Sequence, residues 1–223
     1  MRISVIGAGS IGGTLALRWA RLGHEVRLAN SRGPGTLAGL VAGTSVAASR
    51  IEEVATGAEA VVLSIPFGAV AALPGEVVAS FPAGAVVVDT GNYVPHRRDT
   101  VIDAIEAGQV ESMWVAEQLG RPVVKAFNTI GAASLRDKAL PAGAPGRVAA
   151  PVCADAERDR RVCSSLVDDA GFAPLDAGPL AGSWRQQPGT PVYTADLPPA
   201  EAVAALAAAQ PDHTTAWRSA WAS

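Results

Sequence analysis

The sequence is poor in metal-binding and disulfide-forming residues. Its 223 residues include two cysteines, Cys153 and Cys163, and three scattered histidines. Because there is no CxxC pair and no His/Cys cluster, we expect no metal site. Two widely spaced cysteines are instead typical of buried or idle thiols in a reducing cytoplasm.

Positive charge and long apolar runs are also scarce. The formal net charge is -3, and no basic run is long enough to neutralise several phosphates, so nucleic-acid binding is not expected. The longest apolar stretch, residues 60–73, is interrupted by Ser64 and Pro66, whereas a bilayer span takes about 20 apolar residues. The N-terminus carries no recognisable signal peptide. These features predict a cytoplasmic protein without a membrane partner.

A glycine loop near the N-terminus is the strongest motif present. The apolar run of residues 3–6 breaks into Gly7-Ala8-Gly9-Ser10-Ile11-Gly12, and a helical pattern follows with Ile11, Leu15, Trp19 and Leu22 on one face. In a dinucleotide-binding turn, the first glycine permits the tight turn, the second lets the backbone approach a pyrophosphate, and the third lets the helix pack on the strand. The alternative is a glycine-rich turn without a ligand, but strand, loop and helix follow one another in the required order. We therefore expect Gly7, Gly9, Ser10, Ile11 and Gly12 to bind a dinucleotide.

The end of the next predicted strand, residues 25–30, indicates which dinucleotide. Folds that prefer NAD usually place an acid here to bind the ribose 2′-hydroxyl, whereas an arginine suits the 2′-phosphate of NADP. This chain has Asn30-Ser31-Arg32 and no acid. A serine hydroxyl and a guanidinium can both donate hydrogen bonds to a phosphate, so the residues favour NADP. The alternative is that Arg32 is a solvated loop charge.

Apolar runs alternate with helical patterns along the rest of the chain. Further strands are predicted at residues 45–48, 60–65, 85–89, 121–127, 146–153 and 172–176. Helices are predicted at residues 36–41, 50–55, 67–81 with a break at Pro74-Gly75, 99–107, 112–119 and 155–171. This alternation predicts an α/β fold, a Rossmann-type doubly wound, mostly parallel sheet. Composition shifts at Gly178-Pro179, so we expect an NADP-binding domain at residues 1–178. A small C-terminal cap, including an Ala-rich helix at residues 198–209, would follow at residues 179–223.

Small or polar residues follow several of these strands. Ligands of open α/β sheets collect at the carboxyl ends of strands, so these residues should line a binding cleft. The alternative is that they form ordinary strand-to-helix corners. His96, which follows one such loop, is interpreted as a surface histidine rather than a catalyst. The candidate cofactor-binding residues at the strand ends are Ser64, Ile65, Pro66, Thr90, Gly91, Asn92, Ala126 and Asn128.

The order of these motifs resembles the family of NADPH-dependent coenzyme F420 reductases and related dinucleotide-binding reductases. The resemblance extends from Met1 to about Tyr193 and rests on the glycine loop, Asn30-Ser31-Arg32, residues 64–66, 89–92, 124–130 and 175–180. It implies hydride transfer between NADP and the deazaflavin F420, with Asn128 and Thr190-Pro191 beside the deazaflavin ring. Family members tend to carry Leu-Thr-Pro-Leu where this chain has Gly-Thr-Pro-Val at residues 189–192. The resemblance thus covers the cofactor half better than the acceptor half.

The sequence favours an NADP-dependent oxidoreductase whose acceptor is F420 or a flavin-like ring. It lacks a Tyr-xxx-Lys pair, and a conjugated ring spreads the arriving charge itself, so little is required of a protein acid. Asn128 and Thr190 are the candidate catalytic residues, in a positioning role. Two alternatives stay open: a non-catalytic NADP-binding or redox-sensing module, and an NADPH-dependent reductase of a small carbonyl or imine. The expected partner is a small molecule, and a homodimer is an option that the sequence leaves open.

Overall fold

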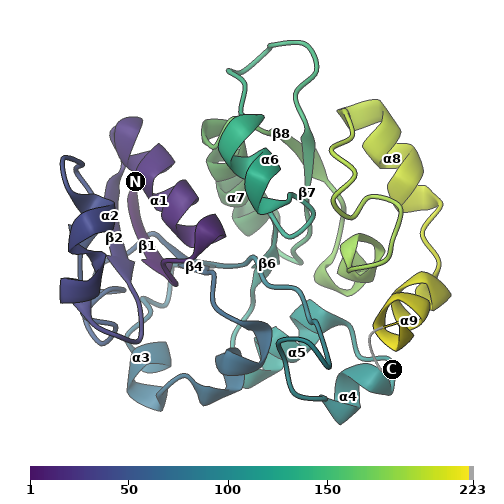
Figure 1. Cartoon of the computed structure of the whole chain (residues 1–223), viewed down its shortest axis with the longest axis horizontal. Coiled ribbons are helices and arrows are strands. Elements are labelled where there is room, and N and C mark those ends of the chain that lie inside the picture. The colour runs from purple at the N-terminus through teal and green to yellow at the C-terminus, as the bar shows by residue number, and fades with distance from the viewer. Residues whose placement is uncertain (221–223) are drawn as a thin grey trace.

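A computed structural model describes residues 1–220 and shows a parallel sheet covered by helices on both faces (Figure 1). The six-stranded sheet has the order β3-β2-β1-β4-β5-β6, and each neighbouring pair is parallel. This is the doubly wound order of dinucleotide-binding folds, and it confirms the predicted fold class. The strands are β1 (Arg2–Ile6), β2 (Glu25–Ala29), β3 (Ala47–Ala48), β4 (Ala60–Leu63), β5 (Val86–Asp89) and β6 (Val124–Lys125).

The register of the sheet brings the strand ends into one row. Ala29, Ile6, Leu63, Asp89 and Lys125 are successive partners across β2, β1, β4, β5 and β6. Each is the last residue of its strand, so the loops that follow all leave the sheet along the same edge. The residues expected at the cleft therefore lie along one edge of the sheet, although Gly7 and Asn128 are 121 positions apart in the chain (128 − 7).

Helices cover the two faces of the sheet and make two separate cores. One face carries α1 (Ser10–Arg21), α6 (Ala132–Asp137) and α7 (Glu157–Asp169). The other carries the 3₁₀-helix η2 (Phe67–Ala72), α3 (Gly75–Ala79), α4 (Asp103–Glu106) and α5 (Glu111–Leu119). A 3₁₀-helix η1 (Pro34–Leu37) and α2 (Ala38–Val41) follow β2. Strands β4 and β5 are buried along their whole length, which explains their continuous apolar runs.

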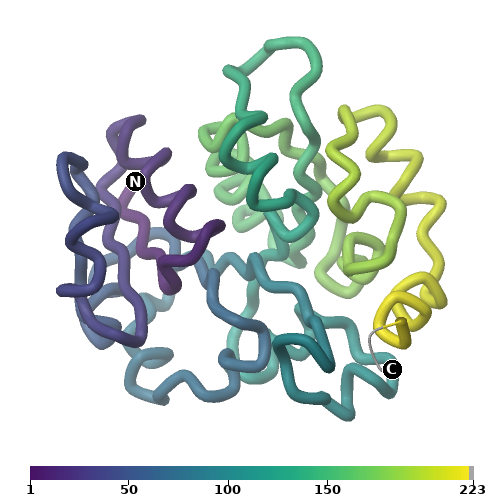
Figure 2. The backbone as a smooth tube through the Cα atoms, viewed as in Figure 1, coloured from purple at the N-terminus to yellow at the C-terminus, as the bar shows by residue number. Residues whose placement is uncertain are grey.

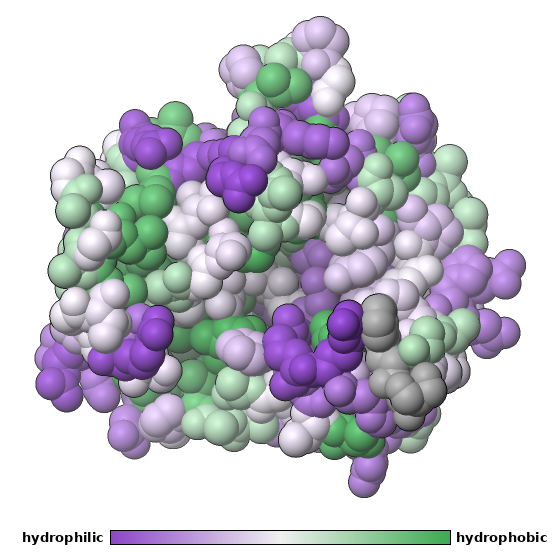
Figure 3. All heavy atoms as spheres, viewed as in Figure 1, coloured by the Kyte–Doolittle hydropathy of each residue, from purple (hydrophilic) through white to green (hydrophobic). Residues whose placement is uncertain are grey.

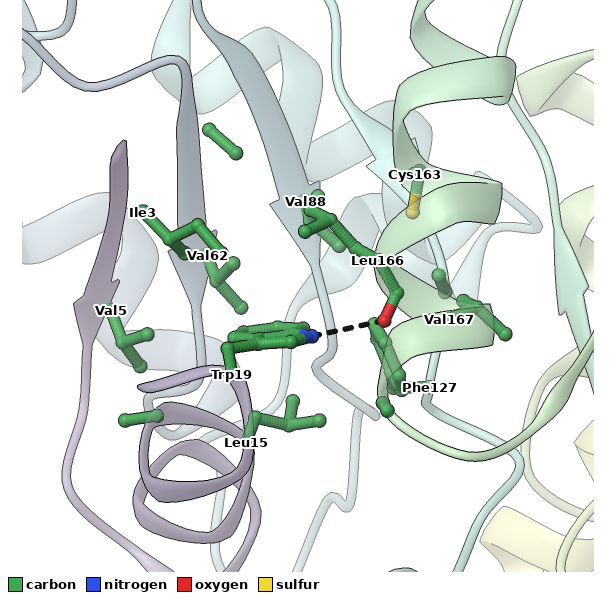
Figure 4. Close-up of a cluster of buried hydrophobic side chains, with 14 of the residues drawn as sticks. Ile3, Val5, Leu15, Trp19, Val62, Val88, Phe127, Cys163, Leu166 and Val167 are labelled. Atoms are coloured by element: carbon green, nitrogen blue, oxygen red, sulfur yellow. Dashed lines mark hydrogen bonds between the residues drawn. The ribbon is translucent and has the colours of Figure 1, made fainter. Parts of the chain in front are cut away.

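Trp19 is the centre of the core beneath α1 (Figure 4). Its side chain is fully buried, and its indole N–H donates to the carbonyl oxygen of Leu166 in α7 at 3.0 Å. Its ring meets Phe127 edge-on, with centroids 5.9 Å apart. One side chain of α1 thus contacts both the loop after β6 and helix α7.

The C-terminal part departs from the single predicted sheet. Strands β7 (Ala149–Val152) and β8 (Ala173–Asp176) form their own two-stranded parallel sheet, and an isolated antiparallel bridge between Lys125 and Cys153 joins it to β6. The 3₁₀-helix η3 (Leu180–Gln186), α8 (Pro199–Ala207) and α9 (Pro211–Ser219) complete the chain. The chain returns through α9 to lie beside α4 and α5 (Figure 2). The guanidinium group of Arg218 in α9 donates a hydrogen bond to the carboxylate of Glu111 in α5. The expected cap at residues 179–223 thus packs on the main body as far as residue 220, and its last three residues lie outside the described part.

Several predicted helices are shorter than expected or absent. Residues 50–55 form turns instead of a helix, and the helix predicted at 99–107 is reduced to α4. Asp99 explains the second case, because its carboxylate accepts the N–H groups of Gly68 and Val94 and fixes a loop there.

The predicted helix at 67–81 splits at Pro74 into η2 and α3, and the strand predicted at 121–127 keeps two residues. The prediction for residues 36–41 becomes η1 followed by α2. Helix α9 was not predicted.

None of the helices within residues 1–220 combines the length and the apolar character needed to cross a membrane.

We expect Trp19→Ala to lower the free energy of unfolding by about 3–5 kcal/mol, because it removes a fully buried ring and leaves a cavity. Leu22→Ala is the matched control, since Leu22 ends the same helix but is 57% exposed; it should change stability by less than about 0.5 kcal/mol. Urea denaturation of both variants checks this. Similar losses in the two variants would contradict the packing described.

Candidate functional site

The glycine loop joins β1 to α1 through contacts that exclude side chains. Gly7 has a positive φ of 111°, and a Cβ there would lie 2.1 Å from the carbonyl oxygen of Ser64. A Cβ on Gly12 would lie 2.0 Å from the carbonyl oxygen of Gly7. Gly9 differs, because a Cβ there would meet no protein atom within 4 Å. Gly7 and Gly12 are thus required by packing, whereas Gly9 leaves open space above the loop.

That open space belongs to a cavity at the carboxyl ends of β1, β2 and β4. The cavity has a volume of about 540 Å³, which is within the range of small-molecule sites. Eight of the residues predicted from sequence line it: Gly7, Gly9, Asn30, Ser31, Arg32, Ser64, Ile65 and Pro66. Ser10, Ile11 and Gly12 form the first turn of α1 next to it, whose N-cap is Gly9 with no capping side chain. The unshared N–H groups of this turn and the helix dipole favour an anion at this end.

Asn30 shapes the far wall of the cavity. Its side-chain oxygen accepts the backbone N–H of Arg32 at 3.0 Å, and its amide nitrogen donates to Thr36 at 2.9 Å. These bonds fix the loop that carries Ser31 and Arg32, both of which are exposed at the rim. Arg32 is the one charged side chain among the cavity-lining residues in the described chain, and no carboxylate opposes it there. The residues present therefore fit a dinucleotide with an extra phosphate on its ribose.

The remaining predicted residues form a second group at the ends of β5 and β6. Asn128 donates through its side-chain nitrogen to Asn92 at 3.1 Å and to the carbonyl oxygen of Gln186 at 2.7 Å. Asn92 returns a bond to the carbonyl oxygen of Asn128 at 2.9 Å. The two asparagines thus make a reciprocal amide pair at this edge of the sheet. Figure 3 shows a hollow near the centre of this face of the molecule, in the region where Figure 1 labels β4 and β6.

Most predicted residues of this group are buried, and Asn128 itself is only 3% exposed. Thr90 is buried, and its hydroxyl donates to the carbonyl oxygen of Leu63 at 2.9 Å. Ala126 is fully buried with its methyl group in the core, and Gly91 is partly buried. Thr190 is buried in a tight turn in which its hydroxyl donates to the carbonyl oxygen of Gln187 at 2.8 Å. Their roles toward a ligand stay predictions.

The two cysteines and His96 do not line the cavity. Cys153 and Cys163 are free and buried, and burial raises the pKa of both thiols far above the usual range. His96 is exposed, with a positive φ of 63°. Within residues 1–220, no three His, Cys, Asp or Glu side chains are grouped to hold a metal ion.

Sequence reasoning missed part of the cavity wall and a buried ion pair. Ile51, Leu73 and Pro74 also line the cavity. The sequence pattern predicts only a helix around Ile51 and a helix that breaks at Pro74, and neither prediction indicates contact with a ligand. Lys125 and Asp89 form an ion pair of 2.9 Å between the ends of β6 and β5. No local pattern marks this pair, because the strand predicted at residues 121–127 places Lys125 within a strand, whereas the observed β6 ends at Lys125.

Comparison with known proteins identifies relatives of this chain. A family model described as NADP oxidoreductase, coenzyme F420-dependent, matches residues 2–93. The crystal structure of hypothetical protein SMa0349 from Sinorhizobium meliloti is 32% identical with a TM-score of 0.75, and the alignment covers 88% of this chain and 95% of that one. A structure from Arthrobacter sp. FB24, described as an F420-dependent NADP-reductase, is 23% identical with a TM-score of 0.66 over 82% of this chain and 87% of its own. The YjhV protein of Escherichia coli K12 is 47% identical over 57 residues, which span 26% of this chain and 42% of YjhV.

The fold and the family match together define an NADP-dependent oxidoreductase. More specifically, the chain belongs to the family of coenzyme F420-dependent NADP oxidoreductases, as the sequence resemblance predicted.

Two glycine substitutions should separate packing from ligand binding. Gly9→Ala should leave the unfolding free energy within about 0.5 kcal/mol of the wild type, since its methyl group meets open space. It should nevertheless lower the affinity for NADPH by about tenfold or more, because the methyl group would prevent a pyrophosphate from reaching the N–H groups at the start of α1. Gly12→Ala should instead destabilise the protein by at least about 1–3 kcal/mol through overpacking. Thermal unfolding and NADPH titration test both, and wild-type NADPH affinity of Gly9→Ala would contradict the site.

Proposed function

We propose that this protein transfers a hydride between NADPH, bound in the cavity at the ends of β1, β2 and β4, and a deazaflavin or flavin-like ring. The observation that carries the proposal is the cavity itself, because it combines an open helix N-terminus, a cationic rim at Arg32 and otherwise uncharged walls. When bound, NADPH supplies a hydride, which is a proton with two electrons, and an oxidised deazaflavin or flavin completes its reduction with a proton from water.

In this proposal, the two ends of the dinucleotide contact different groups of the predicted residues. The first turn of α1 and Gly9 would hold the pyrophosphate, and Ser31 with Arg32 would hold the 2′-phosphate. The nicotinamide would then lie toward the ends of β5 and β6, beside the Asn92–Asn128 amide pair. The carbonyl oxygen of Gln186 accepts from Asn128 of this pair, and the N–H of Thr194 donates to the carbonyl oxygen of the neighbouring Thr129 at 2.9 Å. The C-terminal cap would thus contribute to the acceptor pocket, with Thr190 and Asn128 in positioning roles.

The lack of a suitable proton donor favours a ring acceptor over a carbonyl or imine. Reduction of a carbonyl needs a positioned acid, and the candidates are His96, Thr190 and Tyr193. His96 is exposed, and Thr190 already donates within its turn. Burial raises the pKa of Tyr193, which makes it a weaker acid. A conjugated ring needs less from the protein, because it delocalises the charge itself.

A non-catalytic NADP-sensing module is the second candidate. Its supporting observation is the same scarcity of acid and base groups along the cavity. The two functions differ in whether bound NADPH is ever oxidised, so an assay of turnover distinguishes them.

Arg32→Ala should lower the affinity for NADPH by roughly 10- to 100-fold, because a charge-assisted hydrogen bond is worth about 1.5–3 kcal/mol. The affinity for NADH should stay within about twofold of the wild-type value. The control is Arg161→Ala, since Arg161 is an exposed arginine of α7 whose partner is Glu157; it should alter neither affinity. Calorimetric titration with each nucleotide measures the difference. Equal losses of NADPH and NADH affinity in Arg32→Ala would rule out 2′-phosphate recognition by this residue.

Purified protein mixed with NADPH and F420, FMN or FAD should oxidise NADPH with at least one of these rings, followed by the absorbance of both cofactors. The rate should be first order in protein and should fall in Gly9→Ala. NADPH binding without turnover of any of the three rings would reject the ring acceptor and favour the sensing module.

A further inference from the structure

The short segment 91–94, which follows β5, is held almost entirely by ionisable side chains. The N–H of Gly91 donates to Asp89 at 2.8 Å, and its carbonyl oxygen accepts from the ammonium group of Lys125. The N–H of Tyr93 donates to Glu111 at 3.1 Å. At the outer edge, the carbonyl oxygen of Asn92 accepts from Arg98, and the N–H of Val94 donates to Asp99 at 2.8 Å. Five backbone groups of four consecutive residues are thus fixed by five side chains.

Four of these five side chains are withdrawn from water. The side chain of Lys125 is 0% exposed, that of Asp89 3%, that of Glu111 0% and that of Asp99 1%. Lys125 and Asp89 are 2.9 Å apart, and Ser112 donates to the same carboxylate oxygen at 2.9 Å. A buried ion pair is weak evidence for stability, because apolar residues of the same volume often serve as well or better. Stability alone therefore does not account for a buried lysine and three buried acids around this segment.

The segment holds the amide pair in place. Asn92 is bonded to Asn128 in both directions, and Asn128 is bonded to Gln186. On the other side of the pair, Phe127 takes a positive φ of 65°, which is costly for a residue other than glycine. Its ring is buried against Trp19, so the turn into Asn128 is fixed by the core. The amide pair is therefore rigidly placed from both strands.

We propose that Lys125 and Asp89 are positioning residues, which hold the Gly91–Asn92 backbone and the Asn92–Asn128 amide pair where the nicotinamide meets its acceptor. This inference rests on the proposed function. The ADP-ribose part would be held by the separate cavity around Gly9 and Arg32. Loss of the ion pair should therefore loosen the nicotinamide without releasing the dinucleotide, and a misplacement of about 1 Å can lower a rate by about 100-fold.

The test is the double substitution Lys125→Met/Asp89→Asn, which removes both charges and leaves no buried charge unpaired. The amide oxygen of Asn at position 89 can still accept a hydrogen bond from the Gly91 N–H. Met at position 125 cannot donate to the Gly91 carbonyl oxygen, so that bond is lost. The control is Arg147→Met/Asp168→Asn, because that pair, 2.7 Å apart, lies away from the strand ends. Four quantities are measured on each protein: the melting temperature, the dissociation constant of NADPH, the fluorescence anisotropy of bound NADPH, and kcat with a ring acceptor.

In the Lys125/Asp89 variant we expect NADPH affinity within about threefold of wild type, a lower anisotropy of the nicotinamide, and kcat reduced about 10- to 100-fold. The control should lose stability with anisotropy and kcat unchanged. If the Lys125/Asp89 variant does not fold, Asp89→Glu, which keeps both charges but moves the carboxylate, should give the same pattern. Wild-type anisotropy and kcat in a folded Lys125/Asp89 variant, or equal losses in the control, would overturn the positioning role. If the wild type reduces no ring acceptor, the proposed function fails, and the anisotropy still decides the positioning role.

Discussion

The close approach of β1, α1 and β4 at the glycine loop is the constraint on which the rest of this structure depends. Side chains at Gly7 or Gly12 would overlap backbone oxygens at 2.1 and 2.0 Å, so the helix can start where it does only because both residues lack a Cβ. That start brings the N–H groups of the first turn to the edge of the sheet, beside the ends of β2 and β4. It also sets where the other turns of α1 fall, so that Trp19 reaches Phe127 and Leu166. The same contact thus organises both the cavity and the core behind it.

The two halves of the strand-end row are built from different chemistry. The cavity is lined by glycines, a short apolar wall and the loop that Asn30 fixes, and the one charged lining residue within the described chain is Arg32 at the rim. The ends of β5 and β6 are held instead by buried ions and amides, and the side chains of Lys125, Asp89 and Glu111 are nearly or fully withdrawn from water. Burial raises the pKa of the Glu111 carboxyl, while the nearby cations Lys125 and Arg218 act in the opposite direction. Such a network is expensive to bury, and it fixes the backbone that follows β5 through hydrogen bonds to Gly91 and Tyr93.

The sequence predicted the parts of the molecule that depend on local pattern. The glycine loop, the buried valine-rich strands and the doubly wound order follow from periodicity and from the alternation of strands with helices. Eight candidate residues line one cavity because the register aligns strand ends, a property that the alternation already implies. The shortened helix at residues 99–107 could not be predicted, since it depends on Asp99 accepting N–H groups from Gly68 and Val94. The Lys125–Asp89 pair and the separate β7–β8 sheet depend on contacts between distant segments, which no local pattern encodes.

The central claim is that NADP lies along the row of strand ends, with its phosphates at the glycine loop and its nicotinamide at the amide pair. A crystal structure of the protein with NADP⁺ tests this most directly. The account predicts the pyrophosphate against the first turn of α1, the 2′-phosphate beside Ser31 and Arg32, and the nicotinamide next to Asn92 and Asn128. A dinucleotide bound elsewhere, or one whose nicotinamide points away from β5 and β6, would contradict it.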